Sequence, residues 1–174
     1  PRATEAAGSA ASSVRRHAVR PRRSRTLPAM RDWMTLNLNP AMAAPPPCPG
    51  TRPLTTHDAA ALAHLMYHAY LGTVDDAGES PDDARTEVAR LFRGDFGTLD
   101  PSSLVIDFEG TLSSATIITR DKTRFATGEP FLAFSMTAPA TKRRGLARAG
   151  LHSAMHTLGS RGEPRLHLVV TRAN

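Results

Sequence analysis

Cysteine, aromatic residues and long apolar runs are all scarce in this chain of 174 residues. Cys48 is the only cysteine, so an intramolecular disulfide is excluded, and a reducing compartment such as the cytoplasm is favoured. It lies in a proline-rich stretch, which argues against a catalytic thiol. No apolar run approaches the roughly 18 residues of a membrane-spanning helix, and no apolar segment follows the N-terminal arginines as in a secretory signal. We therefore expect no membrane partner.

Acidic residues are scarce in the first third of the chain. Residues 1–53 contain nine Arg and only two acids, Glu5 and Asp32, whereas residues 54–174 are close to neutral within an overall charge of +6. The high isoelectric point therefore describes the N-terminal segment, and a basic nucleic-acid-binding domain is not expected. A nucleic-acid-associated protein that binds through this segment remains an alternative, testable by salt-dependent binding.

Apolar periodicity is also missing from residues 1–50, which are rich in Arg, Ala, Ser and Pro. Such a composition predicts a disordered tail. Its Arg-rich start resembles an organelle transit peptide. The alternative is a linker or translated upstream sequence, with Met30 or Met34 as the true start. Because the chain begins with Pro1, we expect a fragment.

Strand and helix periodicities alternate over residues 51–174, for which we expect one domain. Capping residues mark the helix starts, with Thr55 and Asp58 forming one capping box and Ser80 preceding Pro81 at the other. The order β-α-α-β-β-β-α-β predicts an α/β fold, a mixed sheet flanked by helices. We expect strands at 51–54, 103–108, 111–119, 130–137 and 165–171, and helices at 55–70, 80–93 and 145–158.

The stretch TAPATKRRGLARAGL (137–151) places four cations at the start of the last helix, where the helix dipole disfavours them. A strand, a basic loop with a glycine and a helix N-terminus together suit phosphate binding, because exposed backbone N–H groups need an acceptor. Gly145 and Ala147 keep the approach to these groups open. The alternative is a solvated basic turn. The spacing matches neither a P-loop nor G-x-G-x-x-G.

This stretch resembles the acetyl-CoA loop of the GCN5-related N-acetyltransferases (GNATs), whose pattern is a proline, then [Q/R]-x-x-G-x-[G/A] opening a helix. Here Pro139 precedes Lys142–Ala147, with Lys142 in place of the usual Gln or Arg, and Gly150 where leucine is common. The order of elements and the ending LVVTRAN (168–174) extend the resemblance over residues 51–174.

The resemblance implies a GNAT-like sheet and direct transfer of an acetyl group from acetyl-CoA to a primary amine, a small molecule or a peptide. It implies that backbone groups of 135–137 contact the pantetheine arm, that amides of 143–148 hold the pyrophosphate, and that the last residue lies near the thioester. The implied cofactor-binding residues are Ser135, Met136, Thr137, Lys142, Arg143, Arg144, Gly145, Leu146, Ala147, Arg148 and Asn174.

Family members continue beyond this asparagine with a helix, often bearing a general-acid tyrosine, and two more strands. The chain ends at Asn174, so we expect a C-terminally truncated domain without a nameable proton donor. Its last strand would lack a neighbour, which predicts poor activity and aggregation. The alternative function is a non-catalytic acyl-CoA-binding module or an inactive fragment. A homodimer is a further open alternative.

Carboxylates between the first two helices are the candidates for the general base. The resemblance places this loop at the acceptor wall, so Asp75 and Glu79, with Asp76 between them, could deprotonate a cationic amine; the alternative is that they are solvated. Glu129 is a weaker candidate. The histidine pairs 64/68 and 152/156 have a spacing that can bind zinc, but no H-E-x-x-H pattern accompanies them. We expect no metal.

Overall fold

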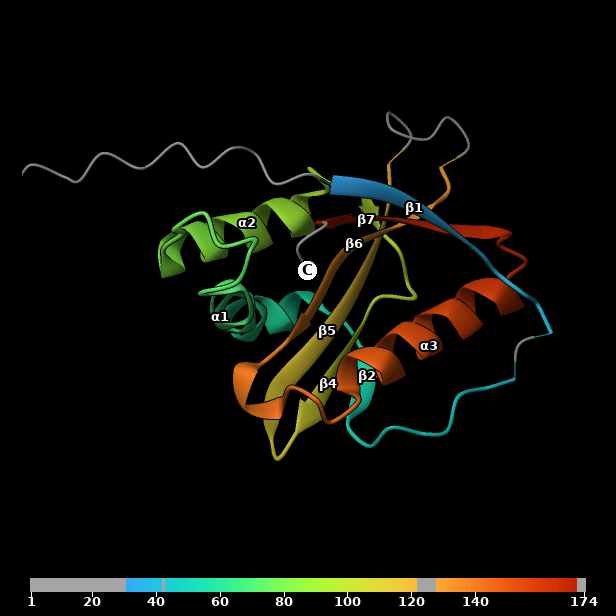
Figure 1. The fold of residues 1–174 in the computed structure, drawn as a ribbon, viewed down its shortest axis with the longest axis horizontal. Coiled ribbons are helices and arrows are strands. Elements are labelled where there is room, and N and C mark those ends of the chain that lie inside the picture. Colours follow the sequence, from blue (N-terminus) through green and yellow to red (C-terminus); the bar gives the residue numbers. More distant parts are fainter. Residues whose placement is uncertain (1–30, 42, 122–127, 172–174) are drawn as a thin grey trace, which may run out of the picture.

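The computed structural model describes residues 31–41, 43–121 and 128–171. Within them, seven strands form one mixed sheet in the order β1-β7-β6-β5-β4-β2, with the short β3 beside β5. Helices α1 and α2 cover one face and α3 covers the other (Figure 1). The strands are β1 (Arg31–Asn37), β2 (Thr51–Pro53), β3 (Thr98–Leu99), β4 (Leu104–Phe108), β5 (Thr111–Arg120), β6 (Pro130–Thr137) and β7 (Arg165–Thr171).

The helices begin where the capping residues predict. Thr55 and Asp58 form a capping box around a 3-10 turn, and α1 (Ala59–Tyr70) follows directly. Ser80 accepts a hydrogen bond from the backbone N–H of Asp83 at the start of α2 (Pro81–Arg93). Gly94 ends α2 in the left-handed conformation, at φ 88°, which glycine adopts without strain.

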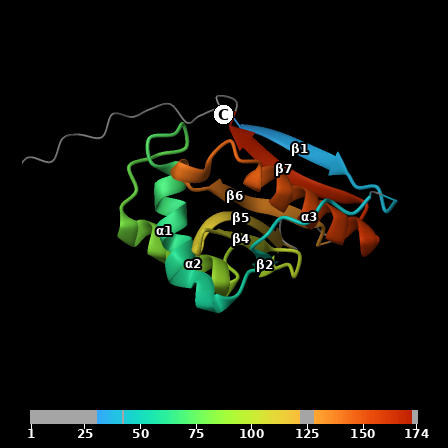
Figure 2. The same cartoon turned by 90° about the horizontal axis from the view of Figure 1, so that it is seen from below.

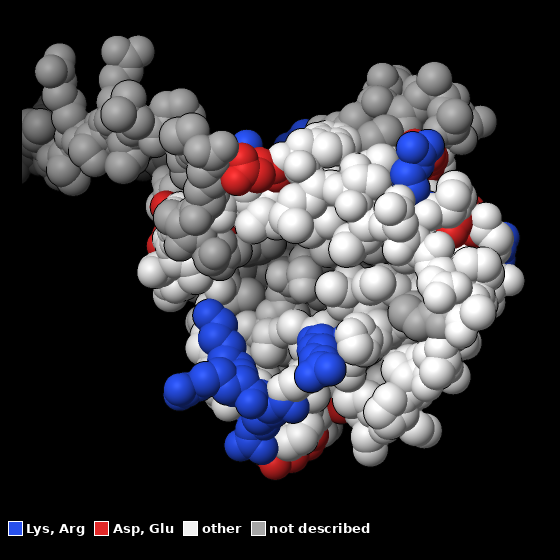
Figure 3. Space-filling model, turned by 45° about the vertical axis from the view of Figure 1, so that its right-hand side comes forward, with Lys and Arg blue, Asp and Glu red and all other residues white. Residues whose placement is uncertain are grey.

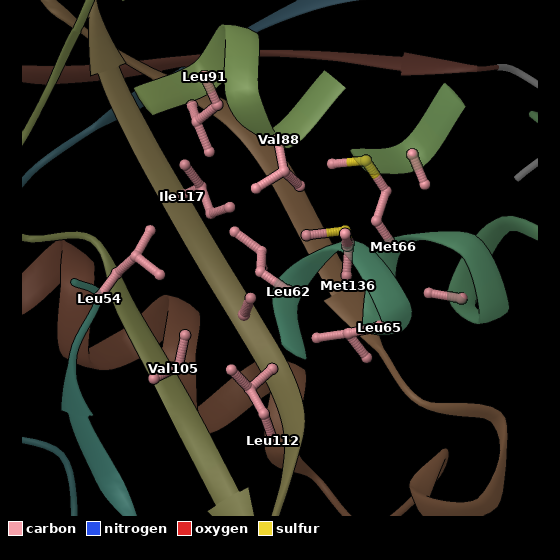
Figure 4. Close-up of a cluster of buried hydrophobic side chains, with 14 residues drawn as sticks. Leu54, Leu62, Leu65, Met66, Val88, Leu91, Val105, Leu112, Ile117 and Met136 are labelled. Atoms are coloured by element: carbon pink, nitrogen blue, oxygen red, sulfur yellow. The ribbon is translucent and has the colours of Figure 1, made fainter. Parts of the chain in front are cut away.

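The core is divided by the sheet into two apolar layers. Figure 4 shows the larger layer, in which Leu62 and Met66 of α1 meet Val88 and Leu91 of α2 over Ile117 of β5. The second layer packs α3 (Leu146–Ser160) against the opposite face of the sheet. Helices on both faces leave the strand ends as the place where loops can form a site.

Gly150 lets α3 approach the sheet closely. A Cβ atom at this position would lie 2.6 Å from Oγ1 of Thr116 and 3.3 Å from Cδ1 of Leu104. The interior glycine, which departs from the GNAT pattern, is therefore a packing residue. It fixes the height of α3 above β5, and with it the position of the basic loop at the start of the helix.

The N-terminal segment corrects one prediction. We predicted a disordered tail over residues 1–50; residues 1–30 lie outside the described residues, but Arg31–Asn37 form β1, which pairs antiparallel with β7 over its whole length. Figure 2 shows β1 lying beside β7 at the edge of the sheet. Leu36 and Leu38 pack on the α3 layer, which explains why this short stretch is ordered. The expectation that β7 lacks a neighbour is therefore wrong.

The other expected elements are present with shifts of a few residues at their ends, so the α/β prediction is confirmed. The turn between β4 and β5 has Glu109 and Gly110 at φ 52° and 75°, the left-handed values that a tight hairpin requires. β1 and β3 were not predicted from the sequence. None of the helices in the described ranges is long and apolar enough to cross a membrane.

Candidate active site

The two central parallel strands, β6 and β7, separate partway along their length. They pair only at Phe131 with His167 and at Leu132 with Leu168. One residue further on, the pairing of β6 with β5 skips Ala133, which is a bulge. Beyond it β6 stays with β5, while β7 stays with β1. The backbone of 133–137 therefore faces a V-shaped opening instead of a neighbouring strand.

The basic loop, residues 142–148, follows β6 at the open end of this V. Within the described chain, none of the backbone N–H groups from Arg143 to Arg148 donates a hydrogen bond; the first helical bond runs from Ala149 N–H to the carbonyl of Gly145. Arg143 and Gly145 have φ values of 64° and 81°. A run of unpaired N–H groups, bent by left-handed residues at a helix start, is the geometry that binds phosphate oxygens.

The cations of the basic loop are exposed and unevenly placed. All four cations of the loop are exposed, and the guanidinium of Arg144 also lies 4.9 Å from the ring centroid of Phe108 on β4. In Figure 3 Lys and Arg side chains gather at one side of a hollow (lower left). The loop therefore offers a diphosphate both backbone donors and exposed positive charge.

A cleft of about 820 Å³ begins at the opening between β6 and β7 and extends to α1 and α2. A volume of several hundred Å³ is typical of a small-molecule site. Ser135 of β6 and the candidate bases Asp75 and Glu79 line it together. Met136 is buried in the core, so only its backbone can contact a ligand.

Asp75 lies at the end of β7, where it accepts a hydrogen bond of 2.6 Å from Oγ1 of Thr171. The guanidinium of Arg31, on β1, is 4.0 Å from the same carboxylate oxygen. Because parallel strands end on the same side of a sheet, this carboxylate lies at the open end of the V, as the basic loop does. The structure thus places one candidate base beside the opening, held by two strands.

Asp76 and Glu79 instead accept hydrogen bonds from their own loop. Asp76 accepts from the N–H groups of Gly72 and Gly78 at 2.6 and 2.8 Å, and these bonds lower the pKa of its carboxyl. Glu79 accepts from the N–H of Ala77 at 2.8 Å and is otherwise exposed to the cleft. Asp76 is therefore ionised at neutral pH.

Tyr67 and Tyr70 of α1 line the cleft as well. Burial, and then the negative charge of Asp75, raises the pKa of Tyr70 to about 12. Its phenol therefore keeps its proton at neutral pH and can donate a hydrogen bond into the cleft. It cannot act there as a proton acceptor.

Other predicted residues do not contribute to the cleft. Glu129 binds Arg165 at 2.6 Å and His167 at 3.1 Å and is not among the lining residues. The predicted contact at Asn174 lies outside the described residues. No group of three possible metal ligands occurs in the described ranges. Trp33 and the bulge at Ala133 were missed; the cluster of Trp33, Met34, Leu36 and Leu38 in an Arg/Pro/Ala-rich region is the signal that could have revealed β1.

Comparison with solved structures decides the architecture. The first similar structure, a GCN5-related N-acetyltransferase from Sphaerobacter thermophilus, has a TM-score of 0.57, 15% sequence identity and coverage of 84% of this chain. The fold is that of the GCN5-related N-acetyltransferases. AAC(6')-Iy, solved with the bisubstrate analogue CoA-S-monomethyl-acetylneamine, matches the GNAT fold of this chain with a TM-score of 0.50, 13% identity and coverage of 71% of this chain and 80% of its own.

An integron cassette protein, HFX_CASS3, from the mobile metagenome of Cole Harbour Salt Marsh, matches with a TM-score of 0.51, 19% identity and coverage of 68% of this chain and 75% of its own. The chain spans 45% of the length of the Sphaerobacter protein. No protein-family model and no curated protein matches the sequence. The structural likeness establishes the GNAT fold, and the activity rests on the site.

Proposed function

We propose that the chain is an acetyl-CoA-dependent N-acetyltransferase. The observation that carries this proposal is the row of unpaired N–H groups from Arg143 to Arg148 at the end of a strand that parts from its neighbour. A diphosphate satisfies these donors, and an extended pantetheine arm satisfies the free backbone edge of 133–137. The exposed cations nearby favour the same charged ligand.

The residues present suit direct transfer. The neutral amine nitrogen of the acceptor bonds to the acetyl carbonyl carbon while the bond from that carbon to sulfur breaks. Coenzyme A leaves as the thiolate, which takes up the proton that the nitrogen loses, and the enzyme mainly positions the two reactants. Asp75 or Glu79 removes the proton from the acceptor ammonium. A backbone N–H beside the bulge at Ala133 polarises the carbonyl. A cytoplasmic location remains a prediction from the single cysteine.

The test is titration with coenzyme A, followed by an assay of thiol release from acetyl-CoA with a panel of amines. Ala147 is exposed in the first turn of α3, so Ala147→Glu places a carboxylate beside the unpaired N–H groups and competes with the ligand's phosphates. We expect a loss of coenzyme A affinity of about 100-fold, roughly 2.7 kcal/mol, with the fold retained.

His152→Glu is the matched control, because it adds the same charge on an exposed position further along α3. Its affinity should stay near that of the wild type. Absence of any binding in the wild type would defeat the proposal. Binding without thiol release for any amine would favour the non-catalytic acyl-CoA-binding module.

A further inference from the structure

We propose that the side chain of Arg144, held against Phe108, binds the ribose 3′-phosphate of coenzyme A and so selects this cosubstrate over nucleotides that lack that phosphate. The inference rests on the proposed function, because it assigns a specificity-determining residue to the nucleotide half of the same ligand. It is carried by the position of one guanidinium, by its lack of an anionic partner and by the order of the strands.

Arg144 is the one cation of the basic loop whose side chain contacts an aromatic ring among the described residues. Its guanidinium carbon lies 4.9 Å from the ring centroid of Phe108. Lys142, Arg143 and Arg148 are exposed and make no ion pair or ring contact within the described ranges. The negative face of an aromatic ring attracts a guanidinium. Arg144 is therefore partly ordered before a ligand arrives, which lowers the entropy that binding would cost.

Phe108 is itself held in place by packing. It is the last residue of β4 and lies half-buried against the core layer of α3. β4 and β6 are both antiparallel to β5, so they run in the same direction and end on the same side of the sheet. The ring therefore lies at the side from which the basic loop leaves β6, and it forms a fixed support for the guanidinium.

The guanidinium of Arg144 is not neutralised by a carboxylate. It makes no ion pair with a described residue, although Glu109 directly follows Phe108. Asp107, the other acid at this end of β4, is bound by Arg52 at 2.7 Å. The N–H donors of Arg144 are therefore available to an anion from solution, and the planar guanidinium matches two oxygens of one phosphate.

The order of the strands indicates which phosphate this is. β7 lies on one side of β6, whereas β5 and then β4 lie on the other. The proposed pantetheine arm follows 133–137 at the opening towards β7, but Arg144 reaches across to β4. A diphosphate at 143–148 that sends the arm to one side must send the nucleoside to the other. The phosphate on that half of coenzyme A is the ribose 3′-phosphate.

Calorimetric titration with coenzyme A and with dephospho-coenzyme A tests the inference, because the two ligands differ only in this phosphate. One charge-assisted contact at an exposed site should make coenzyme A bind about tenfold more tightly. The ratio of the two affinities should shrink at higher ionic strength, because exposed charges are screened.

Arg144→Gln should bring this ratio close to one, because it removes the cation that meets the phosphate. Lys142→Gln is the matched control: it removes the same charge from an exposed position of the same loop that has no ring contact. It should keep the ratio near that of the wild type, even if both affinities fall.

Phe108→Leu tests the aromatic support without changing a charge. It retains apolar packing under α3 but removes the ring face, so the ratio should fall by about threefold. A purely structural role of Phe108 would weaken both ligands alike and leave the ratio unchanged. The melting temperature of each variant shows whether the fold is retained.

The outcomes separate this inference from the proposed function. Coenzyme A binding with a ratio near one in the wild type, or a ratio that Arg144→Gln leaves unchanged, would overturn the inference alone. Absence of coenzyme A binding would overturn both. A ratio near tenfold that Arg144→Gln abolishes and Lys142→Gln preserves would support the assignment of Arg144.

Discussion

The C-terminal ends of β6 and β7 lie at the same side of the sheet, on either side of the V-shaped opening, but differ in charge and in construction. The chain after β6 presents backbone N–H groups without partners and exposed cations. The end of β7 is met by a carboxylate from a distant loop, Asp75, which Thr171 and Arg31 hold in place. One end suits a diphosphate and the other an ammonium, so two substrates of opposite charge can approach one opening without competing.

The difference also lies in how each end is supported. The basic loop depends on the position of α3, which Gly150 sets against β5. The end of β7 depends on β1, which contributes Arg31 and forms the outer neighbour of β7. The packing of α3 and the pairing of β1 can each be disrupted without the other. The basic loop and the end of β7 should therefore lose their structure in different variants.

Removal of β1 should have the largest effect. Deleting residues 1–38 removes the strand pairing along β7, the burial of Leu38 and the partial burial of Leu36, and the lost burial is worth about 2–4 kcal/mol. The exposed edge of β7 should also promote association. Thermal unfolding and light scattering measure both effects. Deletion of residues 1–30 alone is the control, and equal stability of the two deletions would contradict the role of β1.

Neutralising Asp75 should remove the proposed base at the end of β7 and leave the fold intact. Asn at position 75 can still accept the hydrogen bond from Thr171, but it cannot take a proton, so kcat/KM should fall by about 10²–10⁴-fold for every amine. Coenzyme A affinity should not change. A wild-type rate in the steady-state assay would remove this residue as the base and leave Glu79.

Gly150→Leu should displace the basic loop at the start of α3. The added side chain meets Thr116 and Leu104, and overpacking of this kind costs about 1–3 kcal/mol. Displacement of α3 should also weaken coenzyme A binding. His152→Leu, on the exposed face of the same helix, is the control. Chemical denaturation and titration would count against the idea if both variants matched the wild type.

Low pH should have the smallest effect on stability. It acts first on carboxylates whose hydrogen bonds and ion pairs stabilise the fold. Hydrogen bonding to Arg52 lowers the pKa of Asp58, so the stability that it contributes is present above the ordinary pKa of 3.8 and is lost as pH falls through the lower folded value. The melting temperature should be constant from pH 7 to about 5 and fall below about 4.

Asp58→Asn tests the assignment of this acid sensitivity. Because Arg52 is partly exposed, its contribution is screened, and the variant should lose about 1 kcal/mol at pH 7. Its stability should then depend less on pH below 4 than that of the wild type. An unchanged acid slope in thermal scans would assign the effect to other carboxylates.

Local signals made most of the fold predictable. The capping residues of α1 and α2, the left-handed turn at Glu109–Gly110 and the alternation along β4 to β6 act over a few residues, so sequence alone reveals them. The basic loop could also be predicted from the sequence, because exposed backbone donors require only a glycine, a small residue and the start of a helix. Its role in binding coenzyme A stays a prediction.

Tertiary contacts set the rest. β1 escaped notice because its partner, β7, lies more than a hundred residues away and its neighbours in sequence are rich in Arg and Pro. The same holds for Trp33, which reaches the cleft through this pairing. An interior glycine weakens an isolated helix, and only the packed structure shows that a Cβ atom at Gly150 would lie 2.6 Å from Oγ1 of Thr116.

The pairing of Trp33 with Val169 joins an early strand to the last one described. Synthesis delivers the N-terminal part of a chain first, and contacts between remote segments are slow to form. On the ribosome, β1 must therefore wait for nearly the whole domain before its partner emerges. Until β7 emerges, β1 and β6 both lack their partner strand, so newly made chains expose unpaired strand edges that promote association.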